Sequence, residues 1–222
     1  MTNILLNVYD FDANWAYDIL QKNLKPRMSA CILTMSHGTE IPDAASWEKV
    51  YAPGGHIYQD LLRPFEAYGI QAEHISWVSW YHDTPETAAE KVEQADVLFL
   101  TGGLPDVFYR RLEAFGLIKR LRAFPGVVIG ASAGAMVQFQ EYHITPDEDY
   151  DTYGYYPGLG LLDGFELEVH YTGAQVQRES IQRYQRERSK PVYAMYNDGG
   201  LLVQQGNITR LGRVVQFPEG RT

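Results

Sequence analysis

The chain has 222 residues, of which 45% are hydrophobic and 21% charged, and its formal net charge is -9. This length and composition are typical of a globular protein with a full hydrophobic core, and we expect one domain over residues 1–222. Because an acidic surface is repelled by phosphate groups, we expect neither nucleic acid nor a membrane as the partner. A small peptide or amide substrate fits better, and the sequence leaves a homodimer open.

The N-terminus and the cysteine content bear on the compartment. Residues 1–8 lack the basic start and long apolar core of a secretory signal, and no apolar run approaches the ~18 residues of a membrane helix. We therefore expect a cytoplasmic protein. Cys31 is the single cysteine, which excludes an intramolecular disulfide and a metal site made of cysteines alone. We expect no cofactor and no metal.

Short apolar runs alternate with helical patterns as far as about residue 140. This alternation predicts an α/β fold of three layers, in which a mostly parallel sheet is covered by helices on both faces. The expected strands are residues 4–8, 31–35, 75–78, 97–100 and 127–129. The expected helices are one capped by Asp12, one over residues 57–65, one from Pro85 to about Gln94 and one beginning at Pro105.

The pattern changes after Met136. Residues 141–160 are rich in Asp, Tyr, Gly and Pro, which predicts a long irregular loop beside the functional site. A strand over 165–169 should end at His170, and a polar helix should cover about 175–188. Strands at 192–195, 201–203 and 214–217 should follow, separated by tight turns at 198–200 and 206–207.

The strand over 127–129 leads into Gly130-Ala131-Ser132-Ala133-Gly134, a Gly-x-Ser-x-Gly pattern. Between a buried strand and a helix, this pattern is typical of a nucleophile elbow, a sharp turn that exposes the serine hydroxyl. A serine hydroxyl is a poor nucleophile until a base accepts its proton, so Ser132 requires an imidazole within hydrogen-bond reach.

Six histidines compete for the role of this base. His170 has the best placement, because open α/β sheets gather their catalytic groups at the carboxyl ends of strands. His37 follows the second strand and could lie near the same crevice, whereas His143 falls in the irregular stretch. The turn Thr101-Gly102-Gly103 follows the strand over 97–100, and its glycines allow backbone N–H groups to approach a reacting carbonyl.

Phe99-Leu100-Thr101-Gly102-Gly103, Gly130-Ala131-Ser132-Ala133-Gly134-Ala135 and Val169-His170 together resemble the S51 serine peptidases, a family that includes aspartyl dipeptidases and cyanophycinases. The resemblance implies the flavodoxin-like fold of class I glutamine amidotransferases and no cofactor. It also implies Ser132 as nucleophile, His170 as general base, and an oxyanion hole at Gly103 and Ala133 with Gly102 beside it. An acid between Ser132 and His170 should complete the site, and Asp147 is preferred over Glu148, Asp149 and Asp151.

Leu104 departs from the family, which commonly has Asn after its paired glycines. A polar contact near the oxyanion hole is therefore missing or is supplied by another residue. A pocket for a substrate carboxylate would need a fixed arginine, for which the candidates are Arg110, Arg111, Arg178 and Arg183.

The leading hypothesis is a serine peptidase or amide hydrolase that works through an acyl-enzyme, in the manner of an aspartyl dipeptidase. The alternatives are a catalytically silent binding module of the amidotransferase type and an esterase of the α/β-hydrolase type.

Overall fold

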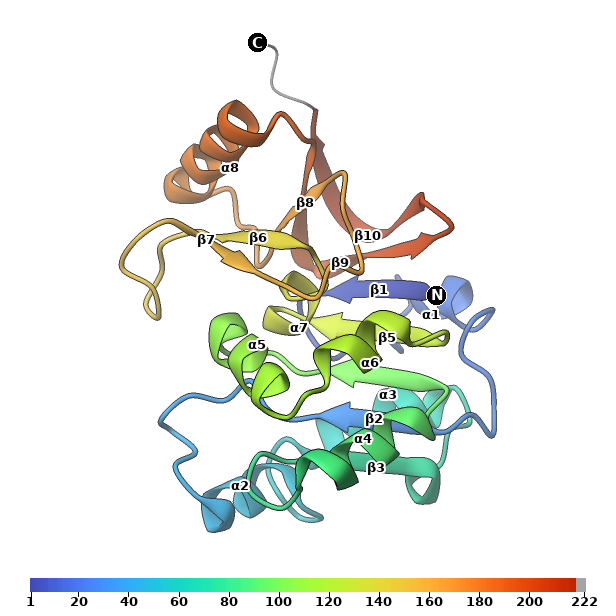
Figure 1. Cartoon of the computed structure of the whole chain (residues 1–222). Helices are drawn as coiled ribbons and strands as arrows, with labels where there is room; N and C mark the ends of the chain where they lie inside the picture. Colours follow the sequence, from blue (N-terminus) through green and yellow to red (C-terminus); the bar gives the residue numbers. More distant parts are fainter. Residues whose placement is uncertain (219–222) are drawn as a thin grey trace.

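A computed structural model describes residues 1–218 as an α/β structure built on one central sheet (Figure 1). The last four residues of the domain expected over 1–222 lie outside the described residues. The strands are β1 (Thr2–Leu6), β2 (Ala30–Leu33), β3 (Ile75–Val78), β4 (Val97–Leu100), β5 (Val127–Ala131), β6 (Glu141–Ile144), β7 (Gly154–Pro157), β8 (Glu166–Glu168), β9 (Val192–Gln204) and β10 (Asn207–Phe217). The helices are α1 (Tyr17–Leu20), α2 (Ala44–Tyr51), α3 (Tyr58–Ala67), the 3-10 helix η1 (Ala72–His74), α4 (Pro85–Glu93), α5 (Pro105–Ala114), α6 (Ile118–Ala123), α7 (Ala133–Met136) and α8 (Gln175–Arg188).

The central sheet has the strand order β10-β9-β1-β5-β4-β2-β3, with β8 paired to β9. The five strands from β1 to β3 in this order are parallel, whereas β9 runs antiparallel to both β1 and β10. The mostly parallel three-layer fold predicted from the sequence is confirmed. Because parallel strands end at the same edge, β1, β4 and β5 deliver their following residues to one place.

The two faces of the parallel strands bury separate cores. Ile32, Phe99 and Ile129 pack with α2 and α3 on one face, while Leu33, Leu100 and Val128 pack with α4, α5 and α6 on the other. This alternation is the period of two expected when a sheet is covered on both sides. Figure 1 looks onto one face of the sheet, with α4, α5 and α6 in front of it and α3 behind it.

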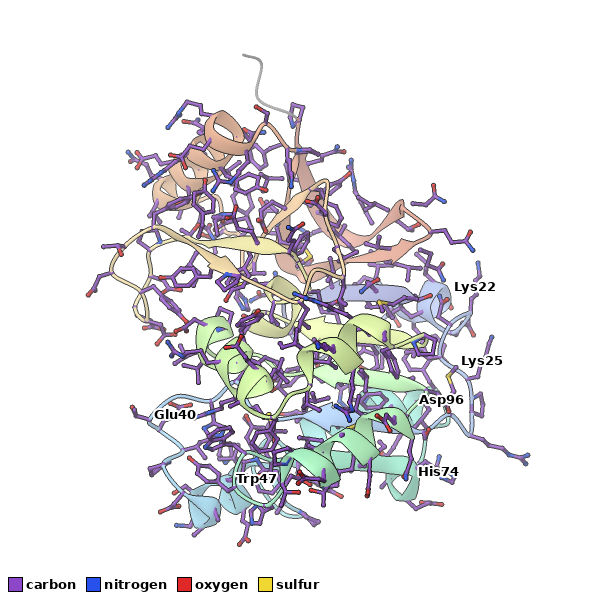
Figure 2. The ribbon with its side chains drawn as sticks, viewed as in Figure 1. Lys22, Lys25, Glu40, Trp47, His74 and Asp96 are labelled. Carbon is purple, nitrogen blue, oxygen red and sulfur yellow. The ribbon has the colours of Figure 1, made fainter. Side chains whose placement is uncertain are left out.

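The loops that follow the parallel strands lie at the carboxyl edge of the sheet. Figure 2 shows Lys22, Lys25, His74 and Asp96 at the opposite, amino edge, and Glu40 on the carboxyl side in the loop after β2. Asp96 accepts hydrogen bonds from the backbone N–H and the hydroxyl of Ser29 at the amino edge, so it links the starts of β2 and β4.

The structure differs from the expected elements where glycines were interpreted as a turn. Residues 198–200 lie inside β9, which is continuous from Val192 to Gln204. A Cβ at Gly199 would lie 2.0 Å from the Arg213 carbonyl oxygen, and one at Gly200 would lie 2.6 Å from the Leu5 carbonyl oxygen. These glycines therefore allow close approach of the neighbouring strands rather than a reversal of the chain.

The stretch 141–160 is more regular than expected, because it contains the antiparallel pair β6 and β7. Tyr142 and Ile144 alternate inward and join a third core with Phe139, Phe165 and Leu167. Asp12 does not cap the first helix, which begins only at Tyr17, and its carboxylate pairs with Arg63 instead. Within residues 1–218, no helix is long and apolar enough to cross a membrane.

Candidate active site

Ser132 stands at a sharp turn between β5 and α7. Its backbone has φ +50° and ψ -113°, a strained conformation for a residue with a side chain. Three hydrogen bonds hold the turn, since the Ser132 N–H donates to the Leu6 carbonyl at 2.8 Å and the Ser132 carbonyl accepts from the N–H groups of Ala135 and Met136 in α7. A Cβ at Gly130 or Gly134 would lie 2.0 Å from a backbone oxygen, so packing requires both glycines of the motif.

His170 lies beside this serine, although 38 residues separate them in the chain. Its Nε2 is 2.9 Å from Ser132 Oγ. His170 follows β8 in a left-handed conformation with φ +49°, and the next residue is fixed by a hydrogen bond from the Tyr171 N–H to the Met195 carbonyl. The side chain is exposed, so substrate and water can reach the ring.

Asn197 occupies the other side of the His170 ring, with its Oδ1 2.9 Å from Nδ1. With an oxygen facing it, Nδ1 carries the proton and donates, which leaves the lone pair of Nε2 directed at the serine hydroxyl. The sequence analysis missed Asn197, because it lies directly before residues 198–200, which were interpreted as a turn between two short strands. β9 instead runs through it beside β8, the strand that precedes His170.

Asp147, the acid expected to orient His170, makes its hydrogen bonds within its own loop. Its Oδ1 accepts from the N–H groups of Asp149 and Tyr150, and its own N–H donates to the Tyr150 carbonyl. No hydrogen bond joins it to His170 within residues 1–218. The β6–β7 connection holds Asp147 on the wall of the cavity, whereas Nδ1 of His170 faces β9. An amide therefore stands where the sequence predicted an acid.

Gly103 and Ala133 both offer backbone N–H groups at the site. Neither N–H has a partner within residues 1–218, and Ala133 is the first residue of α7, where such groups are free. Gly103 has φ +138°, and a Cβ there would lie 2.5 Å from the Ser36 carbonyl oxygen. The Gly102 N–H differs from these two, because it donates to the hydroxyl of Tyr9 at 3.2 Å.

Ser36 supports the glycine turn from below. Its hydroxyl donates to the Gly102 carbonyl at 2.5 Å and lies 2.8 Å from Thr101 Oγ1, while its carbonyl accepts the Leu104 N–H at 2.7 Å. Ser36 is fully buried. It lies in the loop after β2, and no sequence motif marks it.

A cavity of about 720 Å³ opens beside Ser132 and His170. Gly103, Pro105 and Met136 form one wall and the segment 143–150 forms another. Four carboxylic acids line it, and no lysine or arginine does: they are Asp147, Glu148, Asp149 and Glu168. The four candidate arginines are committed elsewhere: Arg110 to Asp106, Arg111 to the carbonyls of Met35 and His37, Arg178 to the Gly173 carbonyl, and Arg183 to Glu187.

His143 lies in the same cavity wall but is only 2% exposed, between two buried glutamates. Its Nε2 is 3.0 Å from Glu168 and its Nδ1 is 3.8 Å from Glu166. Burial by itself lowers the pKa of His143, but the two carboxylates outweigh burial and raise the pKa to about 9. Burial raises the pKa of Glu166. His143 is therefore an imidazolium at neutral pH and cannot act as a base.

His37 is the other histidine considered near the crevice. It is buried, with Nδ1 3.3 Å from the Gly38 carbonyl and its ring stacked on Tyr81. Burial and the nearby Arg111 lower its pKa. No hydrogen bond joins it to Ser132 among the described residues.

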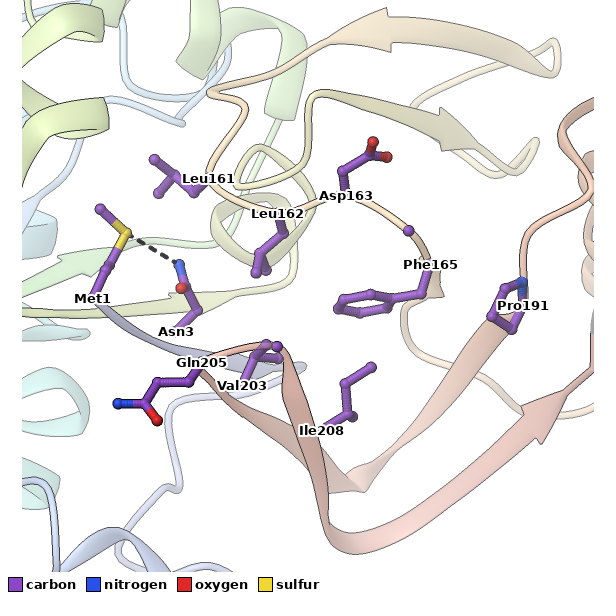
Figure 3. Close-up of a pocket in the computed structure, with 12 residues that line it drawn as sticks. Met1, Asn3, Leu161, Leu162, Asp163, Phe165, Pro191, Val203, Gln205 and Ile208 are labelled. Atoms are coloured by element: carbon purple, nitrogen blue, oxygen red, sulfur yellow. Dashed lines mark hydrogen bonds between the residues drawn. The ribbon is translucent and has the colours of Figure 1, made fainter.

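A second cavity of about 500 Å³ lies at the amino edge, between β1, β9, β10 and the segment 161–165 (Figure 3). Its lining is mainly apolar, including Leu162, Phe165 and Ile208, and its one acid, Asp163, is paired with Lys190. It contains no nucleophile beside a base. Within the part of the chain that the structure describes, no group of three or more His, Cys, Asp or Glu residues could hold a metal ion.

Comparison with known proteins places the chain in a family. The model described as Peptidase family S51 matches residues 33–211. A candidate peptidase E protein from Listeria monocytogenes EGD-e is similar in structure, with a TM-score of 0.70, 16% identity, and coverage of 96% of this chain and 98% of that chain. A peptidase from an acI-B1 actinobacterium has a TM-score of 0.61 and 14% identity, with coverage of 99% and 95%. No curated protein matches the chain.

Proposed function

This chain belongs to peptidase family S51, and from that membership we propose that it is a serine peptidase in which Ser132 is the nucleophile and His170 the general base. The observation that carries the proposal is the 2.9 Å separation of His170 Nε2 and Ser132 Oγ, with Asn197 on the opposite ring nitrogen. A nucleophile, a base and an orienting residue in this order are what acyl transfer requires.

In the first half-reaction, His170 Nε2 accepts the Ser132 proton while Oγ attacks the carbonyl carbon of the scissile amide. The N–H groups of Gly103 and Ala133 donate to the oxygen that becomes negative. His170 then gives its proton to the leaving nitrogen, and the acyl group remains as an ester on Ser132.

In the second half-reaction, water attacks the ester. His170 takes a proton from the water and returns it to Ser132 Oγ, which releases the carboxylic acid. Asn197 Oδ1 accepts the Nδ1–H in both half-reactions and so keeps the ring in one tautomer. As a neutral amide, it stabilises the imidazolium less than a carboxylate would.

The substrate that fits is a small peptide, because the cavity of about 720 Å³ is of the size that holds a small ligand. The resemblance to aspartyl dipeptidases favours an N-terminal aspartate. The charges of the cavity favour the opposite, since four acids and no lysine or arginine line it, and the imidazolium of His143 is buried against Glu166 and Glu168. We therefore propose that the residue bound there is neutral or basic, and that aspartate is a poor substrate.

The test of the reaction is hydrolysis of a dipeptide and tripeptide panel by the wild type and by Ser132→Ala, with a fluorophosphonate as a chemical probe of the serine. The proposal expects cleavage and labelling by the wild type, and neither by Ser132→Ala at equal folding. A folded wild type that the probe does not label would favour the silent binding module.

The test of substrate charge compares matched peptides that differ only in Asp, Ala or Lys at one position. The double variant Glu148→Gln, Asp149→Asn should reduce any preference for Lys over Asp several-fold. Glu73→Gln is the matched control, because Glu73 is an exposed acid in η1, at the opposite edge of the sheet. Equal rates for the Asp and Lys peptides in the wild type would contradict the charge argument but leave the peptidase reaction standing.

A further inference from the structure

Tyr9 reaches the active site from β1, the strand next to β5 in the sheet. It lies three residues beyond Leu6, whose carbonyl accepts the Ser132 N–H. The elbow and the chain that carries Tyr9 are thus fixed to each other by a backbone hydrogen bond. Sequence analysis singled out nothing in this loop, since an isolated tyrosine after a strand has no motif.

The Tyr9 hydroxyl oxygen and the side chain of Ser132 both lie against Gly102. A Cβ placed on Gly102 would lie 3.4 Å from Ser132 Cβ and 3.6 Å from the Tyr9 hydroxyl oxygen. The same oxygen accepts the Gly102 N–H at 3.2 Å. Because Gly102 has no side chain, the phenol and the serine both border the position that a Cβ would fill.

The Tyr9 hydroxyl still has its own proton to donate. A phenol can donate one hydrogen bond and accept others, and Tyr9 uses only an acceptor position within residues 1–218. The hydroxyls of Tyr68 and Tyr81 differ, because they donate to the carbonyls of Phe11 and Ile41. The hydroxyl protons of Tyr68 and Tyr81 are thus used in hydrogen bonds to loop carbonyls. The Tyr9 hydroxyl donates no hydrogen bond within residues 1–218.

The ring of Tyr9 is held in place and the hydroxyl is kept neutral. The ring packs edge-on against Phe99 at a centroid distance of 5.6 Å, at the margin of the core beneath α3. Burial raises the pKa of Tyr9, the hydrogen bond from Gly102 opposes this, and the charge of Asp60 adds to it. A neutral phenol in a fixed position is a preorganised donor, which is the property an oxyanion site needs.

We propose that Tyr9 is a further catalytic residue, whose O–H donates a hydrogen bond to the substrate oxygen that becomes negative when Ser132 attacks. It would act with the N–H groups of Gly103 and Ala133, and its proton stays on the phenol throughout. The role rests on the peptidase function proposed above. It also supplies a side-chain donor at a turn where Leu104 has none.

The first test is Tyr9→Phe, read as the second-order rate of fluorophosphonate labelling of Ser132, because the phosphoryl oxygen of the probe occupies the oxyanion position. We expect a fall of about 100-fold, the size found when one oxyanion donor is removed. Tyr58→Phe is the matched control and should label at the wild-type rate. Tyr58 is partly buried against the same core, and its hydroxyl has no hydrogen bond within the described residues.

The second test separates donation by Tyr9 from support of Gly102, because Tyr9→Phe removes both. Fluorinated tyrosines at position 9 keep the size of the ring, make the O–H a stronger donor and make the oxygen a weaker acceptor. At a pH where the phenol stays neutral, the labelling rate should rise with fluorination. A rate that falls with fluorination would show that Tyr9 only supports the turn, and would overturn the proposal.

The two proposals fail in different ways. Labelling of the wild type with an unchanged rate in Tyr9→Phe overturns the role of Tyr9 and leaves the peptidase standing. A folded wild type that is not labelled overturns both. If Tyr9→Phe does not fold, the fluorinated series alone decides, since its members keep the hydroxyl and the ring.

Discussion

Two histidines line the same cavity, and their surroundings differ in every respect that matters for acid–base chemistry. His170 is exposed and lies between a serine hydroxyl and a neutral amide. His143 is 2% exposed and lies between Glu166 and Glu168. The first ring can gain and lose a proton during a reaction, whereas the second is held as a cation.

The charged groups around each ring therefore decide which of the two histidines can be a base. A buried imidazolium between two carboxylates links β6 to β8, and His170 follows β8 in the chain. Thr145 joins the same cluster through its hydroxyl, which donates to Glu168 at 2.8 Å. We therefore interpret His143 as a residue that stabilises the wall of the cavity, and His170 as the residue proposed to accept and donate protons in the reaction.

Substitution of His170 should mainly lower activity, and substitution of His143 should mainly lower stability. The effect on activity is the larger of the two. His170→Gln should lower kcat by a factor on the order of 10⁴ or more, because Ser132 loses its base. Its free energy of unfolding should change by less than about 1 kcal/mol, since the ring is exposed. Steady-state kinetics and urea unfolding check both halves, and a stable variant with nearly full activity would remove His170 from the mechanism.

His143→Phe should mainly lower stability. It leaves two buried carboxylates without their cation, and breaking such a group by removal of one partner costs about 3–5 kcal/mol. A triple variant that adds Glu166→Gln and Glu168→Gln should recover part of this loss, because the uncompensated charges are gone. Urea unfolding of the three proteins measures it, and a single variant as stable as the wild type would contradict the ion cluster.

The free energy of unfolding should depend on pH because of His143. Its pKa is raised in the folded protein to about 9 from an ordinary value of 6.5. The stabilisation is therefore complete below about pH 6.5 and is lost as the pH rises through 9, and it amounts to about 3 kcal/mol. The raised pKa of Glu166 acts in the same direction. Urea unfolding at pH 6 and pH 10 should show this loss in the wild type and not in the triple variant.

The smallest expected effects concern the partner of His170. Asn197→Ala should lower kcat by about 10- to 100-fold through loss of the tautomer, and Asn197→Asp should raise it, because a carboxylate stabilises the imidazolium better. Asp147→Asn is the matched control. It keeps the oxygen that accepts from Asp149 and Tyr150, so kcat should change less than about 3-fold. A large loss in this control would return Asp147 to the mechanism.

The local sequence was sufficient for the fold class and for the two turns of the site. Apolar runs of period two and helical spacings determined the parallel strands and most of their helices, because these patterns depend only on which faces are buried. The glycines around Ser132 were informative for a different local reason. A Cβ at Gly130 or Gly134 would clash with the backbone, so the turn itself requires glycine at these positions.

Which side chains meet depends on how distant parts of the chain are brought together. Asn197 reaches His170 because β9 continues through a Gly-Gly pair that local sequence interprets as a turn, and Asp147 does not because its own loop uses its carboxylate. Tyr9 reaches Gly102 across 93 positions of the chain. Such contacts depend on strand order and on the approach of distant backbones, which periodicity and spacing along one chain do not encode.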